Sequence, residues 1–198
     1  YGSRFVRELG LAAFTSQLEG FAGASALVIE RYDRDAAKVD GRIHQEDVAQ
    51  ALGVPTYEKY EKYGAVTLSR ISQLLDETDE QHPRRTLAKM LTLSVAVGNL
   101  DMHAKNISLL HYEDGEIRIA PMYDVVPQTQ YDTDGEFAFR VNGVIRHEAI
   151  TKADLVDEVA KWGSRRSVHW IDETLEKVRE VARSETPHNS AEPSMQEE

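Results

Sequence analysis

A helix, a polar loop and a β-hairpin that follow one another without interruption place the strongest constraint on the fold of this 198-residue chain. Residues 84–97 are rich in apolar side chains and predict a mostly buried helix, and residues 98–106 form the polar loop after it. The dipeptide Asp114-Gly115, with an apolar strand candidate on each side, is a strong hairpin-turn signal. Because a hairpin returns the chain to its start, we expect Asp124 to lie beside Asn106.

The remaining elements predict a short strand-bearing start and a mainly helical body. Apolar periodicity, turn dipeptides and helix-ending glycines place them. We expect Trp162 and Trp170 to lie in the core, and the inner face of the last helix to carry Val168, Ile171, Leu175, Val178 and either Val181 or Ala182. The expected helices span 4–9, 46–52, 67–77, 84–97, 151–162 and 165–183, and the expected strands span 24–32, 107–112, 116–120, 137–141 and 144–147.

The composition suits one soluble globular domain, with 41% hydrophobic and 29% charged residues. There is no cysteine, so the sequence excludes disulfides and thiolate metal sites and fits a reducing cytosol. The net charge of −11 argues against non-specific nucleic-acid binding by this chain alone. No signal peptide or membrane-spanning run is visible. We therefore expect a cytoplasmic protein with no membrane partner.

The two ends of the sequence carry their own expectations. Residues 184–198 hold two prolines and several Ser, Asn and Glu residues, with almost nothing apolar. They cannot bury enough surface to offset the entropy of ordering, so we expect a disordered acidic tail. The chain starts at Tyr1 rather than at a methionine, and we expect a truncated or processed fragment.

Asp101, Asn106 and Asp124 offer an acid, an amide and a second acid in the order and spacing of a phosphoryl-transfer site. Such a site needs an acceptor hydroxyl that is oriented and relieved of its proton, a task suited to an aspartate. It also needs Mg²⁺, which prefers hard oxygen ligands such as an Asn amide oxygen and an Asp carboxylate. Each residue alone favours turn capping. The joint order and spacing favour phosphoryl transfer.

His103 and Lys105 lie inside the same loop. Lys105 could neutralise phosphate oxygens as a point charge, and His103 could steady the loop or contact a nucleotide. A zinc site built on His103 and Asp101 is the weaker alternative, because no further His or Cys clusters with them in the sequence.

A charged aromatic stretch lies between the second and third expected helices. Tyr57, Tyr60 and Tyr63 alternate there with Lys59, Glu61 and Lys62. Core packing together with solvated surface is the favoured interpretation, and contact with a substrate or partner is the alternative.

The run Asp-Met-His-Ala-Lys-Asn-Ile-Ser at residues 101–108 resembles the catalytic loop of HipA-like serine/threonine kinases, the toxin halves of bacterial toxin–antitoxin pairs. Pro121-Met122-Tyr123-Asp124 resembles the metal-binding segment of that family, and residues 28–33 resemble its hinge. His44-Gln45-Glu46-Asp47, Lys59-Tyr60-Glu61 and residues 140–163 match in order. The resemblance runs from about residue 4 to about residue 183.

This resemblance implies ATP and Mg²⁺ as cofactors and a role for each site residue. Asp101 would be the catalytic base, and Asn106 and Asp124 would hold Mg²⁺. The side chains near the nucleotide would be Glu30, Arg31, Tyr32, Asp33, Gln45, His103, Lys105 and Tyr123.

The resemblance also implies a protein-kinase-like fold, mainly α with short β-hairpins (α+β), with a helical large lobe and only a remnant of the small lobe. Residues 1–33 would be the remnant and hinge, 34–183 the large lobe, and 184–198 the tail. The family's glycine-rich loop and ATP-binding lysine would lie upstream, since residues 1–97 contain neither. We expect the isolated chain to be inactive and to expose the apolar strand face around Ala26, Val28 and Ile29, or to pair with a separate small-lobe chain.

Two functions of different kinds follow. The first is ATP- and Mg²⁺-dependent phosphoryl transfer to a protein Ser or Thr hydroxyl. Aminoacyl-tRNA synthetases are among the family's targets, so growth arrest and persistence are the implied outcome. The second is an inactive lobe that binds a helix-turn-helix antitoxin and reaches DNA only through it. A small-molecule kinase of the aminoglycoside or choline type shares the Asp-to-Asn spacing, but the Lys105-Asn106-Ile107-Ser108 run and the Tyr123-Asp124 pair argue against it.

Overall fold

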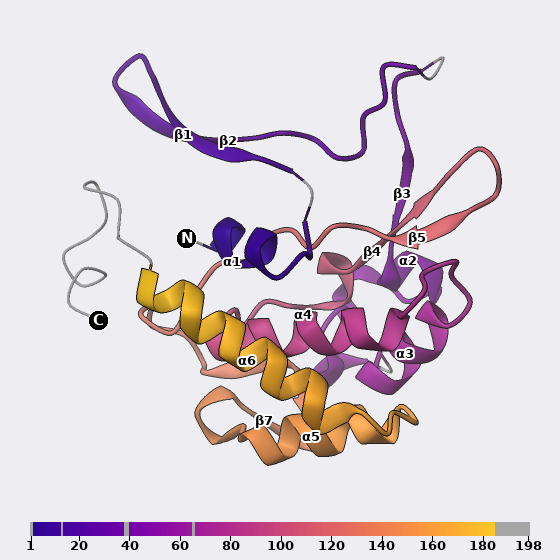
Figure 1. Ribbon diagram of the computed structural model, residues 1–198, viewed down its shortest axis with the longest axis vertical. Helices are drawn as coiled ribbons and strands as arrows, with labels where there is room; N and C mark the ends of the chain where they lie inside the picture. The colour runs from indigo at the N-terminus through magenta and orange to yellow at the C-terminus, as the bar shows by residue number, and fades with distance from the viewer. Residues whose placement is uncertain (1, 13, 38–39, 65, 185–198) are drawn as a thin grey trace.

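The computed structural model describes residues 2–12, 14–37, 40–64 and 66–184 (Figure 1). A helical body carries short antiparallel sheets, and a β-hairpin projects from it near the N-terminus. This mixed content agrees with the expected α+β class. The helices are α1 (Gly2–Glu8), α2 (Val48–Ala51), α3 (Leu68–Leu75), α4 (Pro83–Val97), α5 (Lys152–Lys161) and α6 (Ser167–Ser184), with 3₁₀ turns η1 (Thr56–Glu58), η2 (Glu61–Tyr63), η3 (Ala104–Asn106) and η4 (His147–Ala149). The strands are β1 (Ser16–Phe21), β2 (Ala24–Ile29), β3 (His44–Asp47), β4 (Ser108–His111), β5 (Ile117–Ile119), β6 (Glu136–Val141) and β7 (Val144–Arg146).

Helix α4 forms the centre of the body and contacts α1, α3, α5 and α6. Its leucines at 87, 91 and 93 are fully buried, so the prediction of a buried helix at 84–97 is confirmed. Pro83 begins the helix at a position where its missing N–H costs no hydrogen bond, and Gly98 ends it in the left-handed conformation. The polar loop therefore starts from a fixed point in the core.

Both predicted hairpins are present. β4 pairs with β5 around Asp114-Gly115, and β6 pairs with β7 around Asn142-Gly143. Gly115 has a φ of +88° and Asn142 one of +53°, the left-handed conformations that such tight turns require. The second hairpin leads to α5, whose predicted N-cap Thr151 makes a capping box with Asp154.

The sequence did not predict strand β3. Residues 46–52 read as one helix, but His44–Asp47 pair with Ser108–His111 and only Val48–Ala51 are helical. Asp47 ends the strand and caps the helix, because its side chain accepts a hydrogen bond from the Gln50 N–H. The partner strand lies about sixty residues away in sequence, and local periodicity cannot detect such pairing. Strand β1 was also missed, since Ser16–Phe21 lacks a clear apolar alternation.

The predicted inner face of the last helix was wrong at Val168, and of the alternatives Val181 and Ala182 it is Val181 that faces inward. Ile171, Val178 and Val181 of α6 are buried, whereas Val168 is 54% exposed and Ala182 faces solvent. Thr174 and Ser167 take the corresponding buried places. The positions of the apolar side chains alone therefore predicted the wrong buried residue in the first turn of α6, where Ser167 rather than Val168 faces inward. Trp162 is buried as expected, and Trp170 is half-buried against the core.

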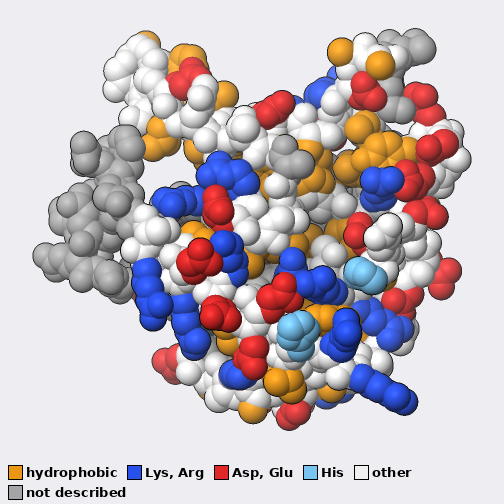
Figure 2. All heavy atoms as spheres, in the orientation of Figure 1, with side chains coloured by type: hydrophobic (Ala, Val, Ile, Leu, Met, Phe, Trp, Pro, Cys, Tyr) orange, Lys and Arg blue, Asp and Glu red, His pale blue; other side chains and the backbone are white. Residues whose placement is uncertain are grey.

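Hairpin β1–β2 extends away from the body and exposes apolar side chains (Figure 1, Figure 2). Leu18 pairs with Leu27 across the two strands, and both are half exposed, at 50% and 56%. Ile29 and Phe21 are exposed to a similar extent. The expectation of an exposed apolar strand face is thus confirmed at Ile29, but Leu27 rather than Ala26 or Val28 carries most of it, because alternate residues point to opposite faces.

Two further expectations concern the whole chain. The predicted tail at 184–198 lies, beyond Ser184, outside the described residues. Among the helices that the structure describes, none combines the length and apolar character needed to cross a membrane.

Candidate active site

The polar loop begins at Gly98, a position that favours glycine over any residue with a side chain. Its φ is +69°, and a β-carbon there would lie 2.5 Å from Cγ2 of Thr129. The Gln128 N–H donates to the Gly98 carbonyl at 2.8 Å, and the Asn99 N–H donates to the Ser94 carbonyl at 2.8 Å. These bonds fix the first residues of the loop against both α4 and the segment after β5.

The structure brings Asp101, Asn106 and Asp124 together, as the sequence predicted. The side-chain amide nitrogen of Asn106 donates to the Asp101 carbonyl oxygen at 2.9 Å and to Oδ2 of Asp124 at 3.2 Å. Both partners are acceptors, so the amide must present its nitrogen to them. The amide oxygen of Asn106 is thereby left for another ligand. One side chain thus joins the loop to the returning strand segment.

Asp124 is held in an unusual backbone conformation. Its φ of +55° lies in the left-handed region, which costs a residue with a side chain about 1 kcal/mol or more. The surrounding segment is fixed by α1 and the chain after it. The Met122 N–H donates to the Leu11 carbonyl at 2.8 Å, and Gly2 lies so close to the Val125 carbonyl that a β-carbon there would overlap it. The backbone on both sides of Asp124 is therefore held in place, and the carboxylate itself accepts from Asn106.

Asp101 is contacted by a residue that sequence reasoning did not single out as part of the site. The Tyr60 hydroxyl donates to Asp101 Oδ1 at 2.5 Å, and the Tyr60 ring meets His103 edge-on with centroids 5.1 Å apart. Burial, and then the bond to Asp101, raise the pKa of Tyr60, so its hydroxyl remains a donor at neutral pH. Tyr57 and Tyr63 of the same aromatic stretch are mostly exposed. No sequence signal separated Tyr60 from these neighbours.

His103 is buried behind Asp101. Its Nε2 atom lies 2.8 Å from the Lys59 ammonium and 3.8 Å from Asp101 Oδ2. Because the ammonium group can only donate, Nε2 must accept and the proton sits on Nδ1. Burial lowers the pKa of His103, which keeps the ring neutral. Among the described residues, the buried Nδ1 has no hydrogen-bond partner, and so a polar atom at the site is left open.

Lys105 points away from the acid–amide set. Its ammonium group donates to Oδ2 of Asp47 at 2.7 Å, where it meets the N-cap of α2. The expected contact of Lys105 with phosphate would require this ion pair to open or to be shared. The pair instead ties the loop to strand β3, and a hydrogen bond from the Val48 N–H to the Ile107 carbonyl at 2.9 Å reinforces that junction.

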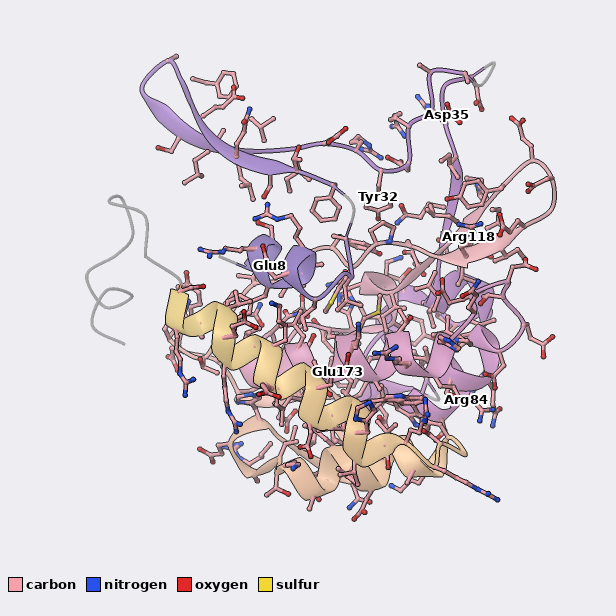
Figure 3. All side chains as sticks on the ribbon, viewed as in Figure 1. Glu8, Tyr32, Asp35, Arg84, Arg118 and Glu173 are labelled. Atoms are coloured by element: carbon pink, nitrogen blue, oxygen red, sulfur yellow. The ribbon has the colours of Figure 1, made fainter. Side chains whose placement is uncertain are left out.

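Tyr123, next to Asp124, lies in a second polar cluster with Tyr32. The Tyr123 hydroxyl lies 2.6 Å from the Ser108 hydroxyl and donates to the Lys105 carbonyl at 2.7 Å. The centroid of the Tyr123 ring is 6.3 Å from that of the Tyr32 ring. Gln45 of β3 donates to Ser108 at 3.1 Å, and its side chain also bonds to Tyr32. Figure 3 shows Tyr32 pointing from the segment after β2 toward the body. Burial raises the pKa of both tyrosines, so both hydroxyls stay protonated.

The other predicted nucleotide residues lie further along the extended segment. Asp33 is paired with Arg31 and Arg34, at 2.5 and 2.7 Å, and the bond from Arg31 lowers the pKa of its carboxyl. Glu30 is exposed and accepts from the Thr15 hydroxyl at 3.1 Å. The described side-chain bonds of Asp33 and Glu30 thus run to neighbouring arginines and to Thr15 rather than to the acid–amide set. Of the four residues from Glu30 to Asp33, Tyr32 alone reaches Tyr123 through a described contact.

The donors at the site suit a hard cation that is shared with a ligand. Among the residues that the structure describes, no group of three or more His, Cys, Asp or Glu side chains could hold a metal ion. Asn106 and Asp124 are adjacent and each carries an oxygen that could bind a cation, although the amide nitrogen of Asn106 is the atom that faces Asp124. Mg²⁺ is commonly held by one or two side chains and completed by phosphate and water, whereas zinc would need a fuller set. The weaker zinc alternative at His103 and Asp101 gains no support from these contacts.

Comparison with known proteins identifies the family. The sequence model of the HipA-like C-terminal domain matches residues 1–185. The chain belongs to this family. The "Putative kinase Y4mE" of Sinorhizobium fredii is 38% identical over 144 residues, which cover 70% of this chain and 34% of that protein. The "Serine/threonine-protein kinase toxin HipA" of Shewanella oneidensis is 26% identical over 144 residues, 65% of this chain and 33% of that protein.

A solved structure shows the same fold. The HipA chain in a Shewanella oneidensis complex of HipA, HipB and operator DNA superposes with a TM-score of 0.78 at 23% identity. The superposition covers 96% of this chain and 50% of that one. The HipA-like chain therefore has the fold of HipA, and the resemblance drawn from the loop motif is confirmed. It spans about a third of the length of the curated relatives described above.

Proposed function

We propose that this chain is the part of a HipA-like protein kinase that carries the catalytic base and the metal ligands. The reaction would be ATP- and Mg²⁺-dependent phosphoryl transfer to a Ser or Thr hydroxyl of a protein. The observation that carries the proposal is the Asn106 amide, which joins the Asp101 backbone to the Asp124 carboxylate. Turn capping would not require these residues to meet, whereas phosphoryl transfer requires a base and metal ligands in one place.

Each residue then has a defined task. Asp101 would accept the proton of the acceptor hydroxyl at Oδ2, since no hydrogen bond among the described residues occupies that oxygen. Asn106 and Asp124 would hold Mg²⁺, and Mg²⁺–ATP would supply the phosphoryl group. Tyr32, Gln45 and Tyr123 would contact the nucleotide through their adjoining rings and polar groups. Phosphoryl transfer depends chiefly on such positioning and charge neutralisation.

The rest of the machinery would come from chain that lies outside this sequence. We propose that a small lobe with a glycine-rich loop and a lysine packs on hairpin β1–β2, whose exposed Leu18, Leu27 and Ile29 offer an apolar face. It could belong to the same polypeptide or to a separate chain. An aminoacyl-tRNA synthetase would be a fitting substrate, growth arrest the outcome, and the cytoplasm the compartment.

A calorimetric titration with Mg²⁺–ATP tests the proposal, on this chain and on any longer polypeptide that its gene encodes. Asp124→Ala is expected to weaken binding that depends on Mg²⁺, whereas Asp101→Asn should abolish transfer and leave nucleotide affinity nearly unchanged. Asp157→Asn, on the exposed face of α5, is the matched control. Transfer that survives Asp101→Asn at full rate would show that the base is assigned wrongly.

A second candidate is a binding module for a helix-turn-helix antitoxin. The solved HipA relative was determined together with HipB and operator DNA, which favours a partner of this kind. DNA would be reached only through the antitoxin, because the chain carries a net charge of −11. Antitoxin binding by a chain that binds no nucleotide in either form would favour this function over catalysis.

A further inference from the structure

Tyr60 lies in a short segment that is hydrogen-bonded to the polar loop. The Ala104 N–H donates to the Lys59 carbonyl at 3.1 Å, and the Lys59 ammonium meets His103 at 2.8 Å. On the other side, Lys62 bonds to Asp134 and Glu136 at 2.9 and 2.7 Å. The segment is therefore pinned between the loop and the start of β6, and the position of the Tyr60 ring is set by both.

The contacts of Asp101 are one-sided. Oδ1 accepts the Tyr60 hydroxyl at 2.5 Å, and Oδ2 lies 3.8 Å from His103 without a hydrogen bond among the described residues. The Asp101 side chain is 35% exposed, so it would otherwise turn freely about its last bond. A donor that holds one oxygen fixes the direction of the other.

A hollow of about 420 Å³ opens beside this pair. Asp101 and Tyr60 form part of its wall, and the exposed rings of Tyr63 and Tyr131 stand at its rim. A cavity of this size holds a few side chains of a polypeptide, and tyrosine is enriched in surfaces that bind other proteins. Because Asp101 itself lines the hollow, an acceptor that enters it arrives next to the proposed base.

We propose that Tyr60 is a positioning residue: its hydroxyl holds Asp101 so that the free carboxylate oxygen meets an acceptor hydroxyl carried into the adjoining hollow by a polypeptide substrate. This rests on the proposed phosphoryl transfer and adds a residue to it. In this role Tyr60 would act through Asp101, to which its hydroxyl is bonded, and not through the nucleotide. Its loss should therefore slow the chemical step and leave nucleotide binding as it is.

The test compares steady-state kinetics of Tyr60→Phe and wild type, in this chain and in any longer polypeptide that its gene encodes. We expect kcat to fall about 10- to 100-fold, the cost typical of a misplaced catalytic group. The KM for ATP and the calorimetric affinity for Mg²⁺–ATP should change by less than about two-fold. Tyr57→Phe is the control, because this tyrosine of the same aromatic stretch is 74% exposed and does not line the hollow.

Replacing Tyr60 with p-aminophenylalanine supplies the rescue. This residue keeps the ring and restores an N–H donor at the same place, so kcat should recover in large part. A Tyr60→Phe variant with wild-type kcat would overturn the proposal. So would a fall in kcat matched by an equal loss of nucleotide affinity, or one that the donor does not rescue. Absence of Asp101-dependent transfer from the wild type in every form would instead refute the proposed function, and the role of Tyr60 with it.

Discussion

Replacing Gly98 with alanine is expected to destabilise the fold at the start of the polar loop, residues 98–106. Gly98 ends α4 with a φ of +69°, and an L-residue held there costs about 1–2 kcal/mol. The new β-carbon would lie 2.5 Å from Cγ2 and 3.0 Å from Oγ1 of Thr129. Thr129 cannot retreat freely, because the preceding Gln128 N–H is bonded to the Gly98 carbonyl. Crowding of this kind costs about 1–3 kcal/mol, which gives a total of about 2–5 kcal/mol.

Urea unfolding of the 198-residue chain measures this loss, and two variants separate its parts. Gly10 has nearly the same φ, +67°, and no described atom lies within 4 Å of the β-carbon that alanine would add. Gly10→Ala should therefore lose only the conformational part, about 1–2 kcal/mol. Adding Thr129→Ala to Gly98→Ala should recover about 1–3 kcal/mol.

Equal losses for Gly98→Ala and Gly10→Ala would refute the steric part of this reasoning. A Thr129→Ala change that recovers nothing would do the same. If Gly98→Ala were neutral, the left-handed end of α4 itself would be in question, and with it the path of the loop toward Asp101.

Three further predictions concern the surroundings of the site. Burial lowers the pKa of His103 in the fold, so its neutral state adds stability above the ordinary pKa of 6.5, and this contribution is lost as pH falls below that value. The urea midpoints at about pH 7.5 and pH 5.5 should therefore differ less in His103→Gln than in wild type. An equal difference in the two proteins would contradict the burial of His103. Asp47→Ala removes the N-cap of α2 and the partner of Lys105 and should cost about 1 kcal/mol or more, whereas Gln50→Ala, which leaves the Lys105 pair intact, should cost less in the same unfolding assay. Leu27→Thr should reduce binding of the dye ANS to the exposed hairpin while changing the free energy of unfolding by less than about 0.5 kcal/mol; a much larger loss would mean that this face is covered in solution.

The parts of the site that follow one another along the chain could be predicted from the sequence. Asp101, Asn106 and Asp124 are separated only by a polar loop and a tight hairpin, and the Asp114-Gly115 turn determines how the chain comes back. The buried helix before the loop was equally evident from its apolar periodicity. Local signals were sufficient because each element contacts the next.

The contacts that cross from distant segments could not be predicted. Tyr60 meets Asp101 from 41 positions away, and Lys105 meets Asp47 from 58 positions away. The periodicity of apolar residues along the sequence reveals neither pair, because both depend on how residues 56–64 and β3 pack onto the loop. Tyr57, Tyr60 and Tyr63 are alike as residue types, and only their exposure distinguishes Tyr60.

The pairing of β3 with β4 also determines when the site can form during folding. Its hydrogen bonds join segments 63 residues apart, as between Gln45 and Ser108, so a long loop of chain must close before either strand gains from the other. The ion pair of Lys105 with Asp47 and the hydrogen bond of Gln45 to Ser108 beside Tyr123 depend on that closure. We therefore expect α4 and the β4–β5 hairpin to form early and the active site to form late. On a nascent chain, Asp101, Asn106 and Asp124 could not come together until the segment bearing Asp124 has left the ribosome.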